Sequence, residues 1–305
     1  MSPRQVFKAF AKVNLGLEVL GRRADGYHDV RTVLQTIGLA DTLEVFPARE
    51  GIAFTCSDPS LPTGEDNLVV KAARLVQREF GVRAGARLSL TKRIPSQAGL
   101  GGGSSDAAVA LLATARLWKV EPDRQRLLKL AAGLGSDVPF FLCGGTALGV
   151  GRGEEVYPLP DGPSAHLVVA WPSCGMSTAV AYQLLENRLT APREPHTIQT
   201  IVGDVVRGRL SERHLFNRFE EVAALSETAR EAEAVRRTLF AVGATRALMA
   251  GSGSAWVGFF PGRAAALAGA KAMAHRGFGA AATATLTRAS YWERVLPDPG
   301  KEWLP

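Results

Sequence analysis

The residues best suited to chemistry lie in one glycine-rich segment, residues 95–106, which reads Pro-Ser-Gln-Ala-Gly-Leu-Gly-Gly-Gly-Ser-Ser-Asp. Its four glycines within five positions leave backbone that can adopt positive φ and approach a ligand closely. The apolar residues that follow recur at the i, i+3, i+4, i+7 spacing of a helix: Ala108, Leu111, Leu112 and Ala115. A glycine loop that leads into a helix N-terminus presents N–H groups and a positive dipole end to an anion. The segment therefore predicts a phosphate site, and a glycine turn that only caps a buried helix is the alternative.

The loop matches neither of the two common phosphate-loop sequences. A Walker loop requires Lys and then Ser or Thr after its last glycine, whereas here Asp106 follows Ser105. A dinucleotide fingerprint requires a third glycine where Ser104 stands. Ser104, Ser105 and Asp106 are residue types that cap a helix start, so we expect the helix itself over 107–118. Asp106 would repel a phosphate, so it either points away or reaches the Mg²⁺ of a nucleotide, directly or through water.

Three other places could contribute chemistry, although each has a structural explanation when taken alone. Lys12 and Asn14 lie two apart in a strictly alternating segment and so share one strand face, where a Lys on a solvated surface is the plain alternative. Tyr27 and His28 follow an Asp-Gly turn, where they could stack on and hydrogen-bond a planar base; core packing of Tyr27 is the alternative. Asp137 lies in a stiff turn and is either a helix cap or a functional carboxylate.

The elements that must position these residues follow from periodicity. In the first part we expect strands at 7–20, 30–37, 42–46 and 87–92, with residues 38–41 between the second and third, helices at 67–80 and 124–132, and a hairpin over 144–159. After a boundary at 161–163 we expect a strand at 166–171, a helix at 177–185 and mainly helical structure to residue 240. A strand, strand, helix, strand order ends the chain, at 246–249, 256–260, 262–274 and 281–286. The turn at 250–255 is either structural or closes over a ligand. The pattern predicts an α+β fold with domains at 1–160 and 161–305.

The composition is that of a globular protein with excess positive charge. With 305 residues, 46% of them hydrophobic, the chain has material for two domains or one large one. A net charge of +7 suits an anionic ligand, and because the 36 Lys and Arg are scattered, nucleic acid is not the expected partner. Three distant cysteines, Cys56, Cys143 and Cys174, disfavour a disulfide framework, and the five histidines show no metal-ligand spacing. No leader or membrane-spanning run is apparent. We therefore expect a cytoplasmic monomer or weak homodimer without a structural metal.

Taken together, these motifs resemble those of the GHMP kinases, which bind ATP without a Walker sequence. The resemblance is dense over residues 9–155 and thinner afterwards, where residues 175–178 and 251–253 still fit. It is carried by six segments: 11–15, 23–28, 65–68, 92–95, the glycine loop and 134–139. The segment Arg23-Ala-Asp-Gly-Tyr-His28 is similar to that of the branch acting on a CDP-linked methylerythritol, in the non-mevalonate route to isoprenoids.

The resemblance implies a two-domain α+β fold, with a ribosomal-protein-like nucleotide domain followed by a ferredoxin-like α/β-plait. It also implies phosphoryl transfer from ATP, with Mg²⁺, to a tertiary hydroxyl of the CDP-linked substrate. Asp137 would accept the hydroxyl proton and Lys12 would stabilise the developing charge. The residues implied on the ATP side are Asn67, Lys92, Pro95, Ser96, Gln97, Ala98, Gly99, Leu100, Gly101, Gly102, Gly103, Ser104 and Ser105.

On the acceptor side, the resemblance implies that Tyr27 stacks on the cytosine and His28 hydrogen-bonds it. Asn14, Thr178 and Tyr182 would complete this end, because Thr178 and Tyr182 lie four apart on one predicted helix and share a face. In a related enzyme that face holds a second aromatic against the base. Two alternatives remain: another small-molecule GHMP kinase, for a mevalonate-like or homoserine-like acceptor, and a non-catalytic nucleotide- or RNA-binding protein.

Overall fold

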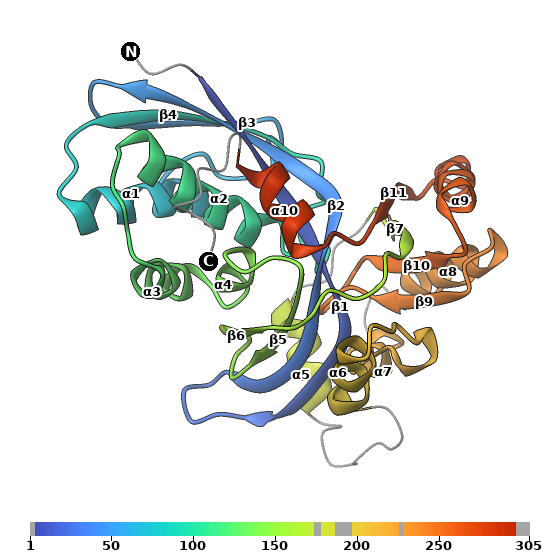
Figure 1. Cartoon of the computed structure of the whole chain (residues 1–305). Helices are drawn as coiled ribbons and strands as arrows, with labels where there is room; N and C mark the ends of the chain where they lie inside the picture. The colour runs from blue at the N-terminus through green and yellow to red at the C-terminus, as the bar shows by residue number, and fades with distance from the viewer. Residues whose placement is uncertain (1–3, 174–177, 187–196, 226–228, 297–305) are drawn as a thin grey trace.

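The computed structural model describes residues 4–173, 178–186, 197–225 and 229–296, and its strands form two sheets (Figure 1). Within these ranges the first sheet has seven strands in the order β3-β4-β2-β1-β8, with β5 and β6 continuing from β2. The second has four strands in the order β11-β7-β10-β9. The strands of the first sheet are β1 (Gln5–Arg22), β2 (His28–Ala48), β3 (Ile52–Cys56), β4 (Gly85–Thr91), β5 (Thr146–Val150), β6 (Glu155–Pro158) and β8 (Phe216–Asn217).

Two long strands, β1 and β2, run diagonally through the molecule and form its central hairpin (Figure 1). The prediction of two separate strands interrupted at 38–41 was wrong, because β2 is continuous from residue 28 to residue 48. The signal at Gly38 marks a shift in register instead, since Phe10 pairs with Ala40 and Lys12 already pairs with Thr36. At this irregularity β2 exchanges its outer neighbour, from β5 to β4, and so bends without ending.

Four helices cover one side of the first sheet: α1 (Leu68–Phe80), α2 (Gly102–Leu117), α3 (Arg124–Leu134) and α4 (Val138–Phe141). Helix α2 is the innermost, with twelve buried residues that are mostly Ala, Val and Leu. It begins at Gly102 rather than at 107, so the prediction that Ser104, Ser105 and Asp106 cap it was wrong. The N-cap is Gly101, whose positive φ of 69° turns the chain directly into the helix without any side-chain cap.

The second sheet has helices packed on it, and its strand, strand, helix, strand order confirms the prediction. Its strands are β7 (His166–Trp171), β9 (Arg246–Met249), β10 (Trp256–Phe260) and β11 (Gly279–Ala284). The stretch before it is mainly helical, as expected. The helices of this half are α5 (Thr178–Glu186), α6 (Ile198–Val206), the short 3₁₀ helix at Glu212–His214, α7 (Glu220–Ala223), α8 (Ala229–Ala241) and α9 (Arg263–His275). The α+β prediction is therefore confirmed.

The two halves share buried surface. One hydrophobic cluster joins β1 and β2 to the second sheet, with members such as Val13, Leu15, Val169, Leu248 and Val257. A further helix that we did not predict, α10 (Arg288–Val295), returns to the first half. The division at residue 160 stays a prediction, because the chain after it contributes to both cores. None of the described helices combines the length and apolarity that a membrane span requires.

The packing of α10 depends on two aromatic side chains that reach the backbone of the first half. The Tyr291 hydroxyl donates to the Phe141 carbonyl at 2.6 Å, and the Trp292 indole donates to the Cys143 carbonyl at 3.2 Å. Both rings lie fully or almost fully buried, so their polar groups need these partners. Helix α10 thus holds the end of α4, close to Asp137, in place.

Candidate active site

A cleft of about 1150 Å³ brings together nearly all the residues that the sequence singled out. Ser105 is an exception, because it is fully buried and does not line the cleft. Thr178 begins α5 but its side chain, the rest of the 175–178 motif and Cys174 lie outside the described residues. The predicted site residues that line the cleft are Lys12, Asn14, Tyr27, His28, Asn67, Lys92, residues 95–104, Asp137 and Tyr182.

At the centre of the cleft, Lys12 of β1 faces Asp137. The Lys12 ammonium lies 3.5 Å from Asp137 Oδ2 and donates to Asn14 Oδ1 at 2.8 Å. Asn14 in turn donates to the Thr32 hydroxyl, which donates to the Gly16 carbonyl. The alternative of a solvated Lys was wrong, since Lys12 is 4% exposed. This part of β1 is covered on both faces, and the Lys12 amide donates to the Leu100 carbonyl of the glycine loop.

Asp137 stands at the N-cap position of the short helix α4 but makes no capping hydrogen bond with its side chain. The capping alternative was therefore wrong. Its carboxylate, with a side chain 37% exposed, is instead directed at Lys12 and the open cleft. A buried ammonium beside a partly exposed carboxylate can hold a hydroxyl between them, with the carboxylate accepting its proton.

The glycine loop approaches other backbone so closely that glycine is required. A Cβ on Gly99, whose φ is +76°, would lie 1.9 Å from the Ala250 carbonyl oxygen. A Cβ on Gly101 would lie 2.9 Å from the Phe141 ring and 3.0 Å from the Lys12 side chain. The turn at 250–255 therefore packs on the loop, and its Gly251 also lines the cleft. The structural role of this turn is confirmed, while its closing over a ligand stays a prediction.

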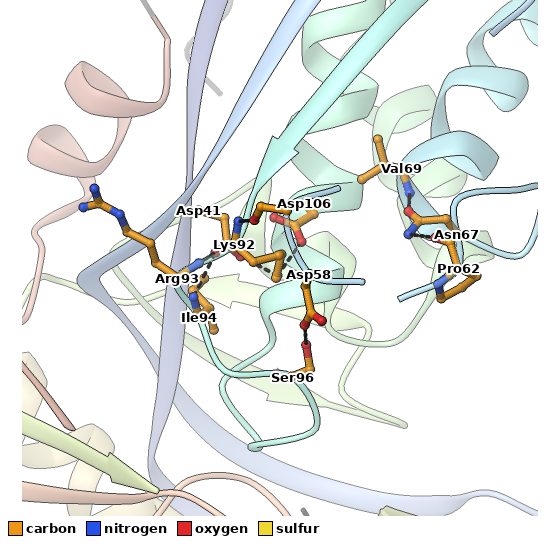
Figure 2. Close-up of polar contacts among 11 residues, drawn as sticks. Asp41, Asp58, Pro62, Asn67, Val69, Lys92, Arg93, Ile94, Ser96 and Asp106 are labelled. Atoms are coloured by element: carbon orange, nitrogen blue, oxygen red, sulfur yellow. Dashed lines mark hydrogen bonds and ion pairs between the residues drawn. The ribbon is translucent and has the colours of Figure 1, made fainter. Parts of the chain in front are cut away.

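Asn67 and Ser96 both line the cleft, and each has polar partners of its own (Figure 2). The Asn67 side chain caps α1 by accepting from the Val69 amide at 2.9 Å, and it donates to the Pro62 carbonyl at 2.8 Å. Its helix was predicted to begin at residue 67; it begins one residue later, at Leu68, with Asn67 as its N-cap. The Ser96 hydroxyl donates to Asp58, 3.2 Å away on the surface.

Lys92 lines the same wall, but its ammonium is held by two buried carboxylates. Lys92 Nζ lies 2.5 Å from Asp41 Oδ2 and 2.8 Å from Asp106 Oδ2 (Figure 2). Burial opposes the charged form of Lys92, yet Asp106 and Asp41 outweigh it and raise the Lys92 pKa. Burial raises the pKa of Asp106 to about 7, although Lys92 opposes this rise. Asp106 thus turns toward Lys92, while its Oδ1 is buried with no hydrogen-bond partner among the described residues.

Aromatic side chains gather at the other end of the cleft. Tyr27 is 54% exposed, so core packing was the wrong alternative, and the Arg152 guanidinium lies 4.8 Å from its ring centre. The His28 ring stacks on Tyr182, with centres 4.7 Å apart and planes 24° apart. Tyr182 meets Phe219 edge-on at 4.8 Å. Burial, with a smaller effect from Asp137, raises the pKa of Tyr182 to about 12, so its hydroxyl stays neutral.

Sequence reasoning missed several residues that line or support this site, among them Asp41, Arg152 and Thr32. Asp41 was placed in the link between two strands, although an acid within an otherwise apolar strand segment is a signal for a buried partner. Arg152 lies between two glycines in the β5–β6 turn, and nothing local connected it with Tyr27. Thr32 holds Asn14 from the neighbouring strand, a cross-strand contact that needs the register of the hairpin.

Comparison with known proteins agrees with this geometry. The model of the GHMP kinases N terminal domain matches residues 67–145. A relative from Solibacter usitatus named 4-diphosphocytidyl-2-C-methyl-D-erythritol kinase is 44% identical over 265 residues, covering 84% of this chain and 81% of the relative. A relative of the same name from Salinibacter ruber is 42% identical, with coverage of 87% and 93%.

Solved structures show the same relationship. A crystal structure of 4-(cytidine 5'-diphospho)-2C-methyl-D-erythritol kinase matches with a TM-score of 0.78 and 38% identity, over 92% of this chain and 98% of that one. The L. major mevalonate kinase, at 16% identity, a TM-score of 0.66 and coverage of 94% and 97%, shows the shared fold alone. Identity above 40% across four fifths of both chains is decisive. The chain belongs to the family of 4-diphosphocytidyl-2-C-methyl-D-erythritol kinases, within the GHMP kinases.

Proposed function

We propose that this chain transfers the γ-phosphoryl group of ATP to the 2-hydroxyl of 4-diphosphocytidyl-2-C-methyl-D-erythritol, in the non-mevalonate pathway to isoprenoid precursors. One observation carries the proposal: the Lys12–Asp137 pair, 3.5 Å apart, lies in a cleft that also contains the glycine loop and the Tyr27, His28 and Tyr182 aromatic group. An anion site, a reacting pair and a base-binding end in one cleft suit a kinase whose acceptor carries a nucleotide.

Asp137 and Lys12 would divide the chemistry at the acceptor hydroxyl. Asp137 would accept the proton, and its partial exposure leaves room for the hydroxyl beside it. An aspartate is a weak base for an alcohol unless a cation stabilises the developing alkoxide, which is the role that Lys12 would take. Asn14 and Thr32 hold the ammonium in place, so little reorganisation would be needed during the transfer.

The glycine loop and the start of α2 would bind the phosphates of ATP. Backbone N–H groups at a helix N-terminus favour anions, and Gly99 and Gly101 let the loop pack tightly on Ala250, Phe141 and Lys12, which fixes its shape. The nucleoside would extend toward Asn67, Pro95 and Ser96, which line the same wall. Phosphoryl transfer depends mainly on such positioning and charge stabilisation, because the protein need not form a covalent bond.

The residues present fit a Mg²⁺ ion that is carried by the nucleotide. Among the described residues, no group of three or more His, Cys, Asp or Glu side chains gathers to hold a metal alone. Magnesium commonly takes one or two carboxylates together with substrate phosphates. Asp106, whose Oδ1 is buried without a hydrogen-bond partner beside the phosphate loop, would be that carboxylate. When bound, Mg²⁺ would neutralise charge on the transferred phosphates.

The aromatic end would receive the cytosine. Tyr27 offers an exposed ring held by Arg152, and His28, which is 9% exposed, would hydrogen-bond the base from the position where it stacks on Tyr182. Asn14, near the reacting pair, would meet the methylerythritol, and Thr178 would contribute from the start of α5. Three further properties stay predictions: a cytoplasmic location, a monomeric or weakly homodimeric state, and the absence of a nucleic-acid partner.

An ATP-consumption assay with three acceptors tests the function: the CDP-linked methylerythritol, mevalonate and homoserine. We expect ADP release with the first alone, because only that acceptor carries a base for the aromatic end. Phosphorylation of mevalonate or homoserine instead would overturn the specific substrate. Absence of consumption with all three would favour the non-catalytic nucleotide-binding alternative.

A further inference from the structure

Asp41 lies on β2, next to the point where the neighbouring strand β4 ends and the chain continues to the glycine loop. The β2–β4 pairing ends at Thr42 and Thr91, and the following residues lead to the loop. Asp41 Oδ1 accepts hydrogen bonds from the amides of Arg93 at 2.5 Å and Ile94 at 2.8 Å (Figure 2). A side-chain carboxylate thus takes over from the strand ladder and fixes the two residues before Pro95.

The other oxygen of Asp41 reaches helix α2 through Lys92. Lys92 Nζ bridges Asp41 Oδ2 and Asp106 Oδ2, and its side chain is only 8% exposed. A Cβ on Gly102, the first residue of α2, would lie 3.3 Å from Lys92 Nζ and 3.0 Å from Ile94. The start of α2 therefore rests directly on this group, which holds both ends of the glycine loop.

The position of Asp41 separates it from any ligand. Asp41 is fully buried and is not among the described residues that line the cleft, whereas Lys92 and Asp106 are. Two buried carboxylates on one ammonium are costly to desolvate, so stability alone is a poor reason for the arrangement. Buried groups whose hydrogen bonds are satisfied specify one geometry strongly.

We propose that Asp41 is a positioning residue of the nucleotide site, which acts through Lys92 and Asp106 to set the glycine loop and the start of α2. The proposal rests on the proposed function, because it assumes that the loop binds a nucleotide. It assigns the Lys92 ammonium to holding Asp106 and α2 rather than to a phosphate. It predicts that changes at Asp41 alter nucleotide affinity even though Asp41 touches no nucleotide.

The test replaces Asp41 with Asn. In Asp41→Asn the remaining oxygen can still accept the amides of Arg93 and Ile94, but the new NH₂ group faces the Lys92 ammonium, donor against donor. We expect the Kd for ADP, measured by calorimetry, and the KM for ATP to rise about tenfold or more, because misplaced binding groups lose affinity steeply. The KM for the acceptor should stay within about twofold of the wild-type value, since the acceptor end is untouched.

A second variant, Asp106→Asn, tests the same proposal if Asp41→Asn does not fold. ADP binding to Asp106→Asn is measured at pH 8 in EDTA, where Asp106 of the wild type is largely ionised and the Mg²⁺ contact proposed for it plays no part. Under these conditions the variant removes negative charge from an anion site, so electrostatics alone predicts tighter ADP binding. The positioning role predicts the opposite change, a Kd for ADP raised about threefold or more, because the ion pair that connects Lys92 to α2 is lost. Equal or tighter ADP binding in Asp41→Asn or in Asp106→Asn, whichever folds, overturns the proposal.

Asp123→Ala is the matched structural control. Asp123 caps α3 by accepting from the Arg126 amide at 2.7 Å and does not line the cleft. Its loss should lower the melting temperature while leaving the Kd for ADP unchanged. A parallel rise of the Kd in the control would mean that lost stability alone weakens binding, and it would overturn the positioning role. Failure of the wild-type chain to bind ADP would overturn the proposed function itself.

Discussion

Replacing Lys12 with Met should remove turnover while leaving nucleotide binding intact. Lys12 is buried, and its stem lies against Gly101 of the glycine loop, so Met keeps the packing and removes only the ammonium. The lost group is the cation that would stabilise the alkoxide formed from the acceptor hydroxyl. The variant therefore isolates the charge from the fold.

The structure sets the size of the effect. A developing negative charge at about 4 Å from a buried ammonium gains about 4 kcal/mol at an effective dielectric constant of about 20. That energy corresponds to roughly a thousandfold in rate. The ion pair with Asp137, by contrast, contributes at most about 1 kcal/mol to stability, because the Asp137 side chain is 37% exposed. Lys12→Met also leaves the buried Asn14 Oδ1 without its donor, which costs about 1–3 kcal/mol of stability, so the melting temperature is needed to separate lost catalysis from unfolding.

The assay measures kcat by ADP release, ADP affinity by calorimetry and the melting temperature, for Lys12→Met, Asp137→Asn and the double variant. Asp137→Asn should cost roughly a hundredfold to ten-thousandfold in kcat, the range for a positioned base. The double variant should lose far less than the product of the two single losses, because the residues act as a unit. Near-normal turnover in either single variant would falsify the assignment, and fully multiplicative losses would show independent roles.

Three further predictions test other parts of the site and fold. Tyr27→Ala should raise the KM for the CDP-linked acceptor about tenfold while that for ATP hardly changes, since Tyr27 is 54% exposed at the aromatic end; equal rises would contradict a role in base binding. Gly99→Ala should cost more than about 2 kcal/mol in urea unfolding, because the new Cβ meets the Ala250 carbonyl at 1.9 Å. Gly26→Ala, also at positive φ but in open space, is its control, and an equal cost would refute the close packing. Burial raises the pKa of Glu220, so the folded protein loses stability when the pH rises above the ordinary pKa of a glutamate and Glu220 ionises. Glu220→Gln should therefore melt higher than wild type at pH 8 but not near pH 4, and a difference independent of pH would disprove it.

Sequence signals predicted helices and strands well where residues close in the chain are enough to determine them. The helix α1, the hairpin of β5 and β6, and the closing order of the second half all follow from periodicity and turn chemistry. The start of α2 did not, because Gly101 in a left-handed conformation substitutes for the polar cap that the sequence offers further on. The continuous β2 was missed for a related reason, since a glycine can mark a change of register as readily as a turn.

The candidate site depended more on the tertiary structure. Sequence patterns identified Lys12, Tyr27, His28 and Asp137, but each alone had a plain structural explanation. Burial of Lys12 on a strand covered on both faces, and the aim of Asp137 toward it rather than toward its own helix, are properties of the packed fold. Contacts between residues far apart in the chain arise only when the hairpin register and helix packing are set.

By itself, then, the sequence determined the GHMP-type glycine loop, the α+β class and the family, because these depend on local spacing and residue type. The tertiary structure decided which charges meet. It placed Lys92 between Asp41 and Asp106, and it pressed Gly99 against the turn at 250–255. The physical reason is that electrostatic and steric effects act over a few ångströms in space, whereas a sequence orders residues only along the chain.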